Sequence, residues 1–287
     1  MRIPGLWRTK MALRAMRKQW LQARAHRALR RFPLVRTKRP HGLDRPLIIT
    51  LTSYPPRFTH LGKTLRSLLD QTVAADGVVL WLAHGDVDTL PNDVRELEAH
   101  GLEIKACDDL RSYKKLIPAL REDPDRYFVT ADDDIYYPRD WLAGLVDTAS
   151  KNPNSVAAWR ARVAPITEED TFVAYRDWPL ANEHSAVVDS RHRLFPTGMG
   201  GVLYPPYAFD TQITDEHLFK ELAPQGDDIW FFWMARLAGT EQKLVKNGCD
   251  FLEWPTAQSN ALYIGNAVGD GNDRQLAAMS RYFGEVP

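Results

Sequence analysis

Short apolar runs alternate along the chain with segments of helical periodicity. The runs at 47–52, 78–82, 102–106 and 127–130 are short and rich in β-branched or aromatic residues, which predicts buried strands. Between them, apolar residues recur at helical spacing, as do the leucines of residues 61–69. Strands that alternate with helices indicate a parallel sheet joined by right-handed crossovers.

The pattern is less regular in the second half of the chain. Residues 141–150 and 228–237 have the apolar spacing of helices, and residues 156–159 form another strand-like run. Residues 160–225 are rich in aromatic residues and proline, so we expect loops and short strands around a pocket. The predicted fold class is therefore α/β, with a mostly parallel sheet flanked by helices.

Charge separates the first 45 residues from the rest. Residues 1–45 contain 14 of the 37 basic residues but only one of the 37 acidic residues, Asp44. Residues 46–287 hold the other 23 basic and 36 acidic residues, so the net charge of zero is the sum of a basic tail and an acidic body. The composition of residues 7–32 favours helix.

We interpret residues 1–45 as a basic helical extension that can associate with an anionic membrane surface. The alternative is a solvated tail without a function. Nucleic acid is not an expected partner, because no nucleic-acid-binding motif accompanies the basic residues.

Composition is that of a globular domain, with 44% hydrophobic and 26% charged residues. No apolar run approaches the length of a membrane span, and the N-terminus lacks the apolar segment of a secretory signal. Two cysteines, Cys107 and Cys249, cannot form a disulfide framework. We expect a cytoplasmic protein that can lie peripherally on the inner face of the membrane.

Three consecutive carboxylates, Asp132, Asp133 and Asp134, directly follow the fourth predicted strand. In parallel sheets, ligands bind beyond the carboxyl ends of the strands. Close carboxylates repel one another unless a cation is present, and oxygen ligands favour Mg²⁺ or Mn²⁺. In an extended segment Asp132 and Asp134 would point to one side and Asp133 to the other, so we predict Asp132 and Asp134 as metal ligands. An aspartate-rich capping turn is the alternative.

Residues 130–138 (TADDDIYYP) look like the D-x-D element of GT-A fold, family-2-like bacterial glycosyltransferases. Residues 52–57 (TSYPPR) resemble the first nucleotide-binding loop of such enzymes, and residues 109–116 (DLRSYKKL) resemble the segment upstream of the metal motif. Residues 197–206 (TGMGGVLYPP) and 226–230 (GDDIW) look like the glycine-rich acceptor-side loop and the acidic pair that supplies the catalytic base. The resemblance covers most of the chain after the basic tail.

The resemblance implies a Rossmann-like GT-A domain over residues 46–287. Residues 46–137 would bind nucleotide and metal, and residues 138–287 the acceptor. The implied reaction is metal-dependent transfer of a sugar from a nucleotide-sugar donor to a glycan or lipid-linked acceptor in bacterial surface polysaccharide synthesis. Asp134 would ligate Mn²⁺ or Mg²⁺ directly, and Asp132 would reach the ribose or the metal through water. The lack of a late histidine ligand favours an inverting reaction.

The resemblance also implies that Asp227 or Asp228 is the catalytic base, and we favour Asp228. Both residues open a predicted helix, whose N-terminal dipole should lower a carboxyl pKa. Asp227 could alternatively serve only as an N-cap.

The predicted donor-binding residues are polar or flexible positions near the strand ends. They are Thr52, Tyr54, Arg57, Arg111, Lys115, Asp132, Gly200 and Gly201. Basic side chains would neutralise the diphosphate, and the glycines would let the backbone approach a sugar closely. A solvated helix face is the alternative for the basic residues, and a β-turn or bulge for the glycines.

Two other functions fit the same motifs. A nucleotidyltransferase can share the sheet and the metal site, but it should have a glycine-rich basic loop after the first strand, which residues 53–57 lack. A catalytically silent sugar-binding relative would not need the acidic pair at 227–228.

Overall fold

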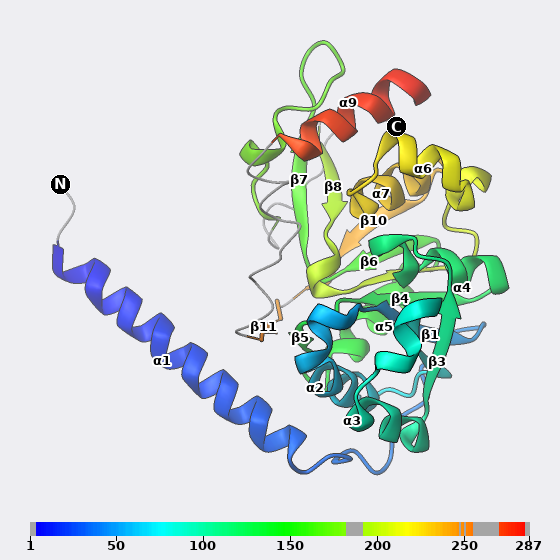
Figure 1. Ribbon diagram of the computed structural model, residues 1–287. Helices are drawn as coiled ribbons and strands as arrows, with labels where there is room; N and C mark the ends of the chain where they lie inside the picture. The colour runs from blue at the N-terminus through cyan, green and yellow to red at the C-terminus, as the bar shows by residue number, and fades with distance from the viewer. Residues whose placement is uncertain (1–3, 182–191, 247, 250, 255–269, 285–287) are drawn as a thin grey trace.

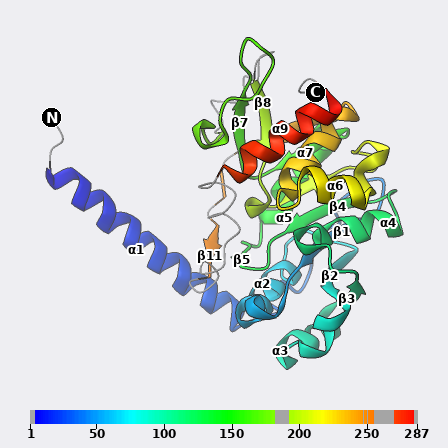
Figure 2. The same ribbon diagram turned by 45° about the horizontal axis from the view of Figure 1, so that its top comes forward.

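The computed structural model describes residues 4–181, 192–246, 248–249, 251–254 and 270–284. A seven-stranded sheet lies at the centre with helices on both faces, and one long helix projects from this body (Figures 1 and 2). The architecture is α/β and Rossmann-like, with a mostly parallel sheet, which confirms the predicted fold class.

The strand order in the central sheet is β10-β6-β9-β4-β1-β2-β3. Its strands are β1 (Leu47–Thr52), β2 (Gly77–Ala83), β3 (Leu102–Cys107), β4 (Tyr127–Ala131), β6 (Ser155–Ala158), β9 (Val202–Tyr204) and β10 (Glu241–Leu244). β1 pairs in parallel with β2 and β4, β2 with β3, and β10 with β6. β9 pairs antiparallel with both β4 and β6, so it runs against the other strands of the sheet.

Two small antiparallel sheets flank the central one. The first pairs β5 (Ile135–Tyr136) with β11 (Leu252–Glu253) immediately after the aspartate triplet. The second pairs β7 (Ala161–Pro165) with β8 (His192–Pro196).

The helices of the body are short to medium in length. They are α2 (Phe58–Leu69), α3 (Asn92–Arg95), α4 (Ile117–Glu122), α5 (Trp141–Lys151), α6 (Glu216–Leu222), α7 (Asp227–Leu237) and α9 (Gly271–Phe283). Short 3₁₀ segments lie between the strands and helices: η1 (Pro55–Arg57), η2 (His84–Thr89), η3 (Glu96–His100), η4 (Arg111–Lys115), η5 (Tyr175–Asp177), η6 (Gly198–Gly200) and η7 (Thr211–Thr214).

Two hydrophobic cores lie on opposite faces of the sheet, because successive side chains of a strand point to opposite sides. In β4, Tyr127 and Val129 join the core that α2 and α5 cover, and Phe128 joins the core that α7 covers. Burial on both faces explains why the sequences of these strands are continuous apolar runs.

The four strands predicted in the first half are β1 to β4, and each observed boundary lies within one residue of the prediction. α3 is followed directly by the 3₁₀ segment η3, which ends at Gly101 with φ 93°. α6, α9 and β10 were not predicted individually; α6 and β10 are short, and α9 is rich in polar residues.

The projecting helix is α1 (Pro4–Leu29), and only its C-terminal end packs on the body (Figure 1). Ala25 is fully buried there, and Leu29 packs against the cluster that contains Leu252 and Trp254. No helix among the described residues is long and apolar enough to cross a membrane.

The segment that follows α1 is tied to the body by hydrogen bonds. The backbone N–H groups of Leu34 and Val35 donate to Asp70 Oδ1 at 2.9 and 2.8 Å, and Arg39 N–H donates to the Thr72 carbonyl at 2.9 Å. The division of the chain at residue 45 stays a prediction.

Candidate active site

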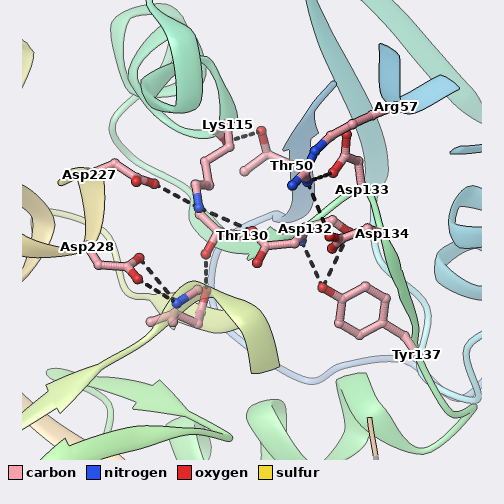
Figure 3. Close-up of polar contacts among 12 residues, drawn as sticks. Thr50, Arg57, Lys115, Thr130, Asp132, Asp133, Asp134, Tyr137, Asp227 and Asp228 are labelled. Atoms are coloured by element: carbon pink, nitrogen blue, oxygen red, sulfur yellow. Dashed lines mark hydrogen bonds and ion pairs between the residues drawn. The ribbon is translucent and has the colours of Figure 1, made fainter. Parts of the chain in front are cut away.

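The site residues gather at the carboxyl ends of β1 and β4 (Figure 3). β9 contributes because it runs antiparallel beside β4: Val202 pairs with Thr130, so the loop that precedes Val202 returns to the end of β4. The start of α7 reaches the same place, where Asp227 lies 2.8 Å from Lys115.

The aspartate triplet forms a turn rather than an extended segment, since only the flanking residues belong to β4 and β5. Asp133 is buried and accepts hydrogen bonds from Ser53 Oγ and Arg57 Nη1, both at 2.6 Å. Asp134 lies 3.3 Å from the same Arg57 nitrogen. Alternation along an extended strand therefore does not describe this segment, because the turn brings Asp133 and Asp134 to one cation.

Arg57 is held by these carboxylates. Burial alone would lower the pKa of Arg57, but Asp133 and Asp134 outweigh burial and raise it. The side chain was predicted to bind the donor, and the structure places it between the loop after β1 and the aspartate turn.

Lys115 is the second buried cation of the site. Its Nζ lies 2.8 Å from Asp227 Oδ2 and 3.2 Å from Asp132 Oδ1, and its carbonyl accepts a hydrogen bond from Thr50 Oγ1 at 2.7 Å (Figure 3). Burial would lower the pKa of Lys115, but Asp132 and the pair Asp227 and Asp228 raise it well above its usual value. The ammonium group therefore joins the end of β4 to the start of α7.

Asp228 is held by the glycine-rich loop. Both of its carboxylate oxygens accept from the Gly198 N–H, at 3.2 and 3.1 Å. Burial first, and Asp227 second, raise the pKa of Asp228 to about 7. The helix dipole was expected to lower this pKa, but desolvation outweighs it. A carboxyl that titrates near neutral pH is suited to general-base catalysis.

Gly198 lies among the charged groups of the site. A Cβ atom at this position would lie 2.9 Å from Lys115 Nζ, 3.1 Å from Asp228 Oδ1 and 3.5 Å from Asp132 Oδ1. Sequence reasoning did not single out Gly198, although it belongs to the glycine-rich run that was recognised.

Gly200 and Gly201 lie further from these charged groups. A Cβ at Gly201, where φ is 85°, would be 2.4 Å from the Trp141 ring, and the Gly200 carbonyl accepts from Trp141 Nε1 at 2.7 Å. Both glycines pack against α5 and the residues before β7, and their role in donor binding stays a prediction.

The remaining predicted donor-binding residues lie around this cluster. Thr52 Oγ1 donates to the Trp81 carbonyl at 2.8 Å, and the Tyr54 ring centroid is 5.9 Å from Arg57 Cζ. Arg111 is exposed and makes none of the ion pairs described above. Tyr137, which was not predicted, is fully buried and its hydroxyl oxygen accepts from the Asp132 N–H at 2.8 Å.

The carboxylates of the site outnumber the cations that pair with them, so a divalent cation would balance the charge. Among the described residues, the four carboxylates of Asp132, Asp133, Asp134 and Asp227 form ion pairs with two cations, Arg57 and Lys115. Burial and the neighbouring Asp132 and Asp133 raise the pKa of Asp134 to about 7, so its charge is poorly compensated. Among the described residues no cluster of three or more metal-ligating side chains is formed. Mg²⁺ can be bound by one or two carboxylates together with substrate phosphates, and the assignment of Asp132 and Asp134 as metal ligands stays a prediction.

No protein-family model matches the chain, and no curated protein matches it. Among solved structures, it is similar to 4-diphosphocytidyl-2C-methyl-D-erythritol synthase from Anaerococcus prevotii DSM 20548, with 13% sequence identity and a TM-score of 0.44. The match covers 87% of this chain and 97% of the other. A likeness of this size does not identify the reaction.

We expect Gly198→Ala to destabilise the protein by about 1–3 kcal/mol, because a methyl group at this position would displace Lys115 from between the carboxylates. Thermal unfolding measures the effect. Gly85→Ala is the matched control, since a Cβ at Gly85 meets nothing within 4 Å. Equal unfolding temperatures for the two variants would contradict the arrangement described for Gly198.

Stability without divalent cations should fall as pH rises from about 4 to about 7. In this window Asp134 and Asp228 keep protons in the folded protein, with pKa values of about 7, whereas the same side chains release them near 3.8 when unfolded. The folded state then binds more protons than the unfolded state, so the free energy of unfolding decreases with pH.

The measurement is the unfolding temperature in EDTA at pH 5 and pH 8, and we expect the higher value at pH 5. The double variant Asp134→Asn and Asp228→Asn should lose most of the difference. Asp123→Asn is the control, because the Arg126 side chain lowers the pKa of Asp123 and that group titrates below the window. A wild-type protein that is more stable at pH 8 would show that these carboxyl groups are not protonated as described.

Proposed function

We propose that the protein is a metal-dependent glycosyltransferase that moves a sugar from a nucleotide-sugar donor to a glycan or lipid-linked acceptor, with inversion. The observation that carries the proposal is the arrangement around Lys115. Asp132, beside the predicted metal ligand Asp134, lies on one side of the ammonium group, and the pair Asp227 and Asp228 lies on the other. A base and a diphosphate-binding group would thus stand next to each other, as a single displacement requires.

In this reaction the acceptor oxygen forms a bond to the anomeric carbon while the bond from that carbon to the donor diphosphate breaks. Asp228 accepts the proton of the acceptor hydroxyl. Its Gly198 hydrogen bonds orient the carboxylate, and its pKa of about 7 allows it to take a proton under neutral conditions.

Asp132 and Asp134 would hold Mn²⁺ or Mg²⁺, which when bound supplies positive charge that stabilises the departing diphosphate. Lys115 forms ion pairs with Asp227 and Asp132, and Arg57 forms one with Asp133. The two cations would thereby preserve the shape of the carboxylate turn while a donor enters and leaves.

The first test is a thermal-shift screen of UDP-, GDP-, CMP- and dTDP-sugars and of the four common nucleoside triphosphates, each with Mn²⁺ or with EDTA. We expect a metal-dependent shift with one class of nucleotide sugar, since ligand at 100 times its dissociation constant stabilises a fold by about 2.7 kcal/mol. A shift with triphosphates alone would indicate nucleotidyl transfer instead. No shift with any compound would overturn the proposal.

Substitutions separate binding from turnover. Asp134→Asn should remove the metal-dependent part of the donor shift. Asp228→Asn should keep that shift but lower turnover by about 10²–10⁴-fold, the usual contribution of a general base. If the wild-type protein binds the donor but Asp228→Asn leaves sugar transfer or donor hydrolysis unchanged, Asp228 is not the base. A wild-type protein that binds the donor without turnover would indicate a silent sugar-binding relative.

The basic extension would hold the enzyme at an anionic bilayer, where lipid-linked acceptors of bacterial surface polysaccharides reside. Residues 1–43 contain no acidic residue, and α1 projects from the body with Met16 and Trp20 exposed. Its apolar positions do not form a continuous stripe, so electrostatic attraction rather than deep insertion would dominate the binding.

Removal of residues 1–22 should lower the affinity for phosphatidylglycerol vesicles by more than 100-fold, because it deletes six basic residues that contribute about 1 kcal/mol each near an anionic surface. This truncation keeps Ala25 and Leu29, which pack on the body. Co-sedimentation measures binding. The full chain should not bind when phosphatidylcholine vesicles replace the anionic vesicles, or when 0.5 M NaCl is present. Equal binding of the truncated and full chains would show that the extension does not contact the bilayer.

A further inference from the structure

A second pair of cations lies beside Asp228, on the acceptor side of the site. Arg160 Nη1 donates to Thr197 Oγ1 at 2.8 Å, and Arg162, two residues later in β7, donates from Nη1 to the Trp178 carbonyl at 2.6 Å. Thr197 immediately precedes Gly198, whose N–H binds Asp228. Asp228 is also close enough to raise the pKa of Arg160, although burial and Arg162 together lower it.

These two arginines differ from Arg57 and Lys115 in their partners. Within the described part of the chain neither Arg160 nor Arg162 forms an ion pair, and both donate to neutral oxygens. Arg162 Nε is buried and has no hydrogen-bond partner there. Carboxylates raise the pKa of Arg57 and of Lys115. Burial and the charge of Arg162 instead lower the pKa of Arg160, so the positive charge of Arg160 and Arg162 is not fully compensated.

The guanidinium groups are also held in place before any ligand binds. Arg162 Cζ lies 5.1 Å from the Tyr175 ring centroid, and the Tyr175 N–H is fixed by Asp273 Oδ1 at 2.7 Å. Arg160 is anchored at Thr197 by its side chain, and its carbonyl accepts from the Thr197 N–H at 3.0 Å. Two adjacent, half-buried guanidinium groups repel each other, and neutral side chains could link the same segments without this cost.

We propose that Arg160 and Arg162 bind an anionic group of the acceptor, a phosphate or a carboxylate, and so bring the reacting hydroxyl to Asp228. The assignment rests on the proposed glycosyl transfer. Planar guanidinium groups match the geometry of both anions and bind them through paired N–H groups. The donor diphosphate would be met by Asp132, Asp134 and their metal at the end of β4, whereas Arg160 immediately precedes β7 and Arg162 lies in it, in the predicted acceptor half.

A phosphate bound by the arginine pair would belong to a lipid, whereas a carboxylate would belong to an acidic sugar. Isothermal titration with geranyl phosphate against geraniol tests the first source, and methyl glucuronide against methyl glucoside tests the second. We expect one anionic probe to bind at least tenfold more tightly than its neutral counterpart, as a charge-assisted hydrogen bond implies. If neither anionic probe is preferred by the wild-type protein, the proposal is wrong.

The double variant Arg160→Gln and Arg162→Gln should lose this preference while its metal-dependent donor shift stays unchanged. Arg176→Gln is the matched control, because Arg176 lies on the neighbouring 3₁₀ turn with 72% of its side chain exposed and should leave both properties intact. Loss of the donor shift in the double variant would assign the arginines to the donor and overturn the proposal. Absence of a donor shift in the wild-type protein would instead count against the proposed function.

If the glutamine variant does not fold, Arg160→Lys and Arg162→Lys provide a second measurement. This variant keeps both positive charges but lacks the planar paired donors, so it should still prefer the anionic probe with about tenfold lower affinity. An affinity equal to that of the wild-type protein would show that paired guanidinium contacts do not form.

Discussion

The site depends on one buried ammonium group. Lys115 Nζ contacts Asp132 from the end of β4 and Asp227 from the start of α7, residues 95 positions apart in sequence. Without this cation the two carboxylates would face each other in a desolvated space, where unpaired charges are costly. The ion pairs therefore join the start of α7 to the end of β4, while the buried apolar side chains of α7 hold the rest of that helix against the sheet, and together they position Asp228.

The topology of the sheet supplies the other half of the arrangement. β9 is inserted antiparallel between β4 and β6, so the loop that precedes it reaches the carboxyl edge without a crossover helix. That loop is glycine-rich because its backbone lies within contact distance of charged side chains: a Cβ at Gly198 would touch Lys115 and Asp228. The antiparallel direction of β9, the glycine-rich loop before it and the buried lysine together allow five carboxylates to lie close to one another.

Features that depend on local sequence could be predicted, whereas features that depend on contacts between distant residues could not. The strands β1 to β4 were predicted because their apolar runs are local, and the position of the aspartate triplet at a strand end followed from them. The partners of the charged residues could not be predicted, because Lys115 and Asp227 meet only through the folded sheet. A turn at the aspartate triplet was only the alternative to an extended segment, and its shape could not be predicted because it depends on Ser53 and Arg57 from the loop after β1.

The charge of the site changes sign from the proposed donor side to the proposed acceptor side. In the proposed reaction Asp132 and Asp134 would hold a metal-bound diphosphate, and the incompletely compensated positive charge of Arg160 and Arg162 would hold an anionic acceptor. Asp228 lies between these regions, and its raised pKa results from burial and from Asp227 beside it. If Asp228 acts as the proposed base, its protonation would leave both ligands in place, because each ligand would be held by other groups.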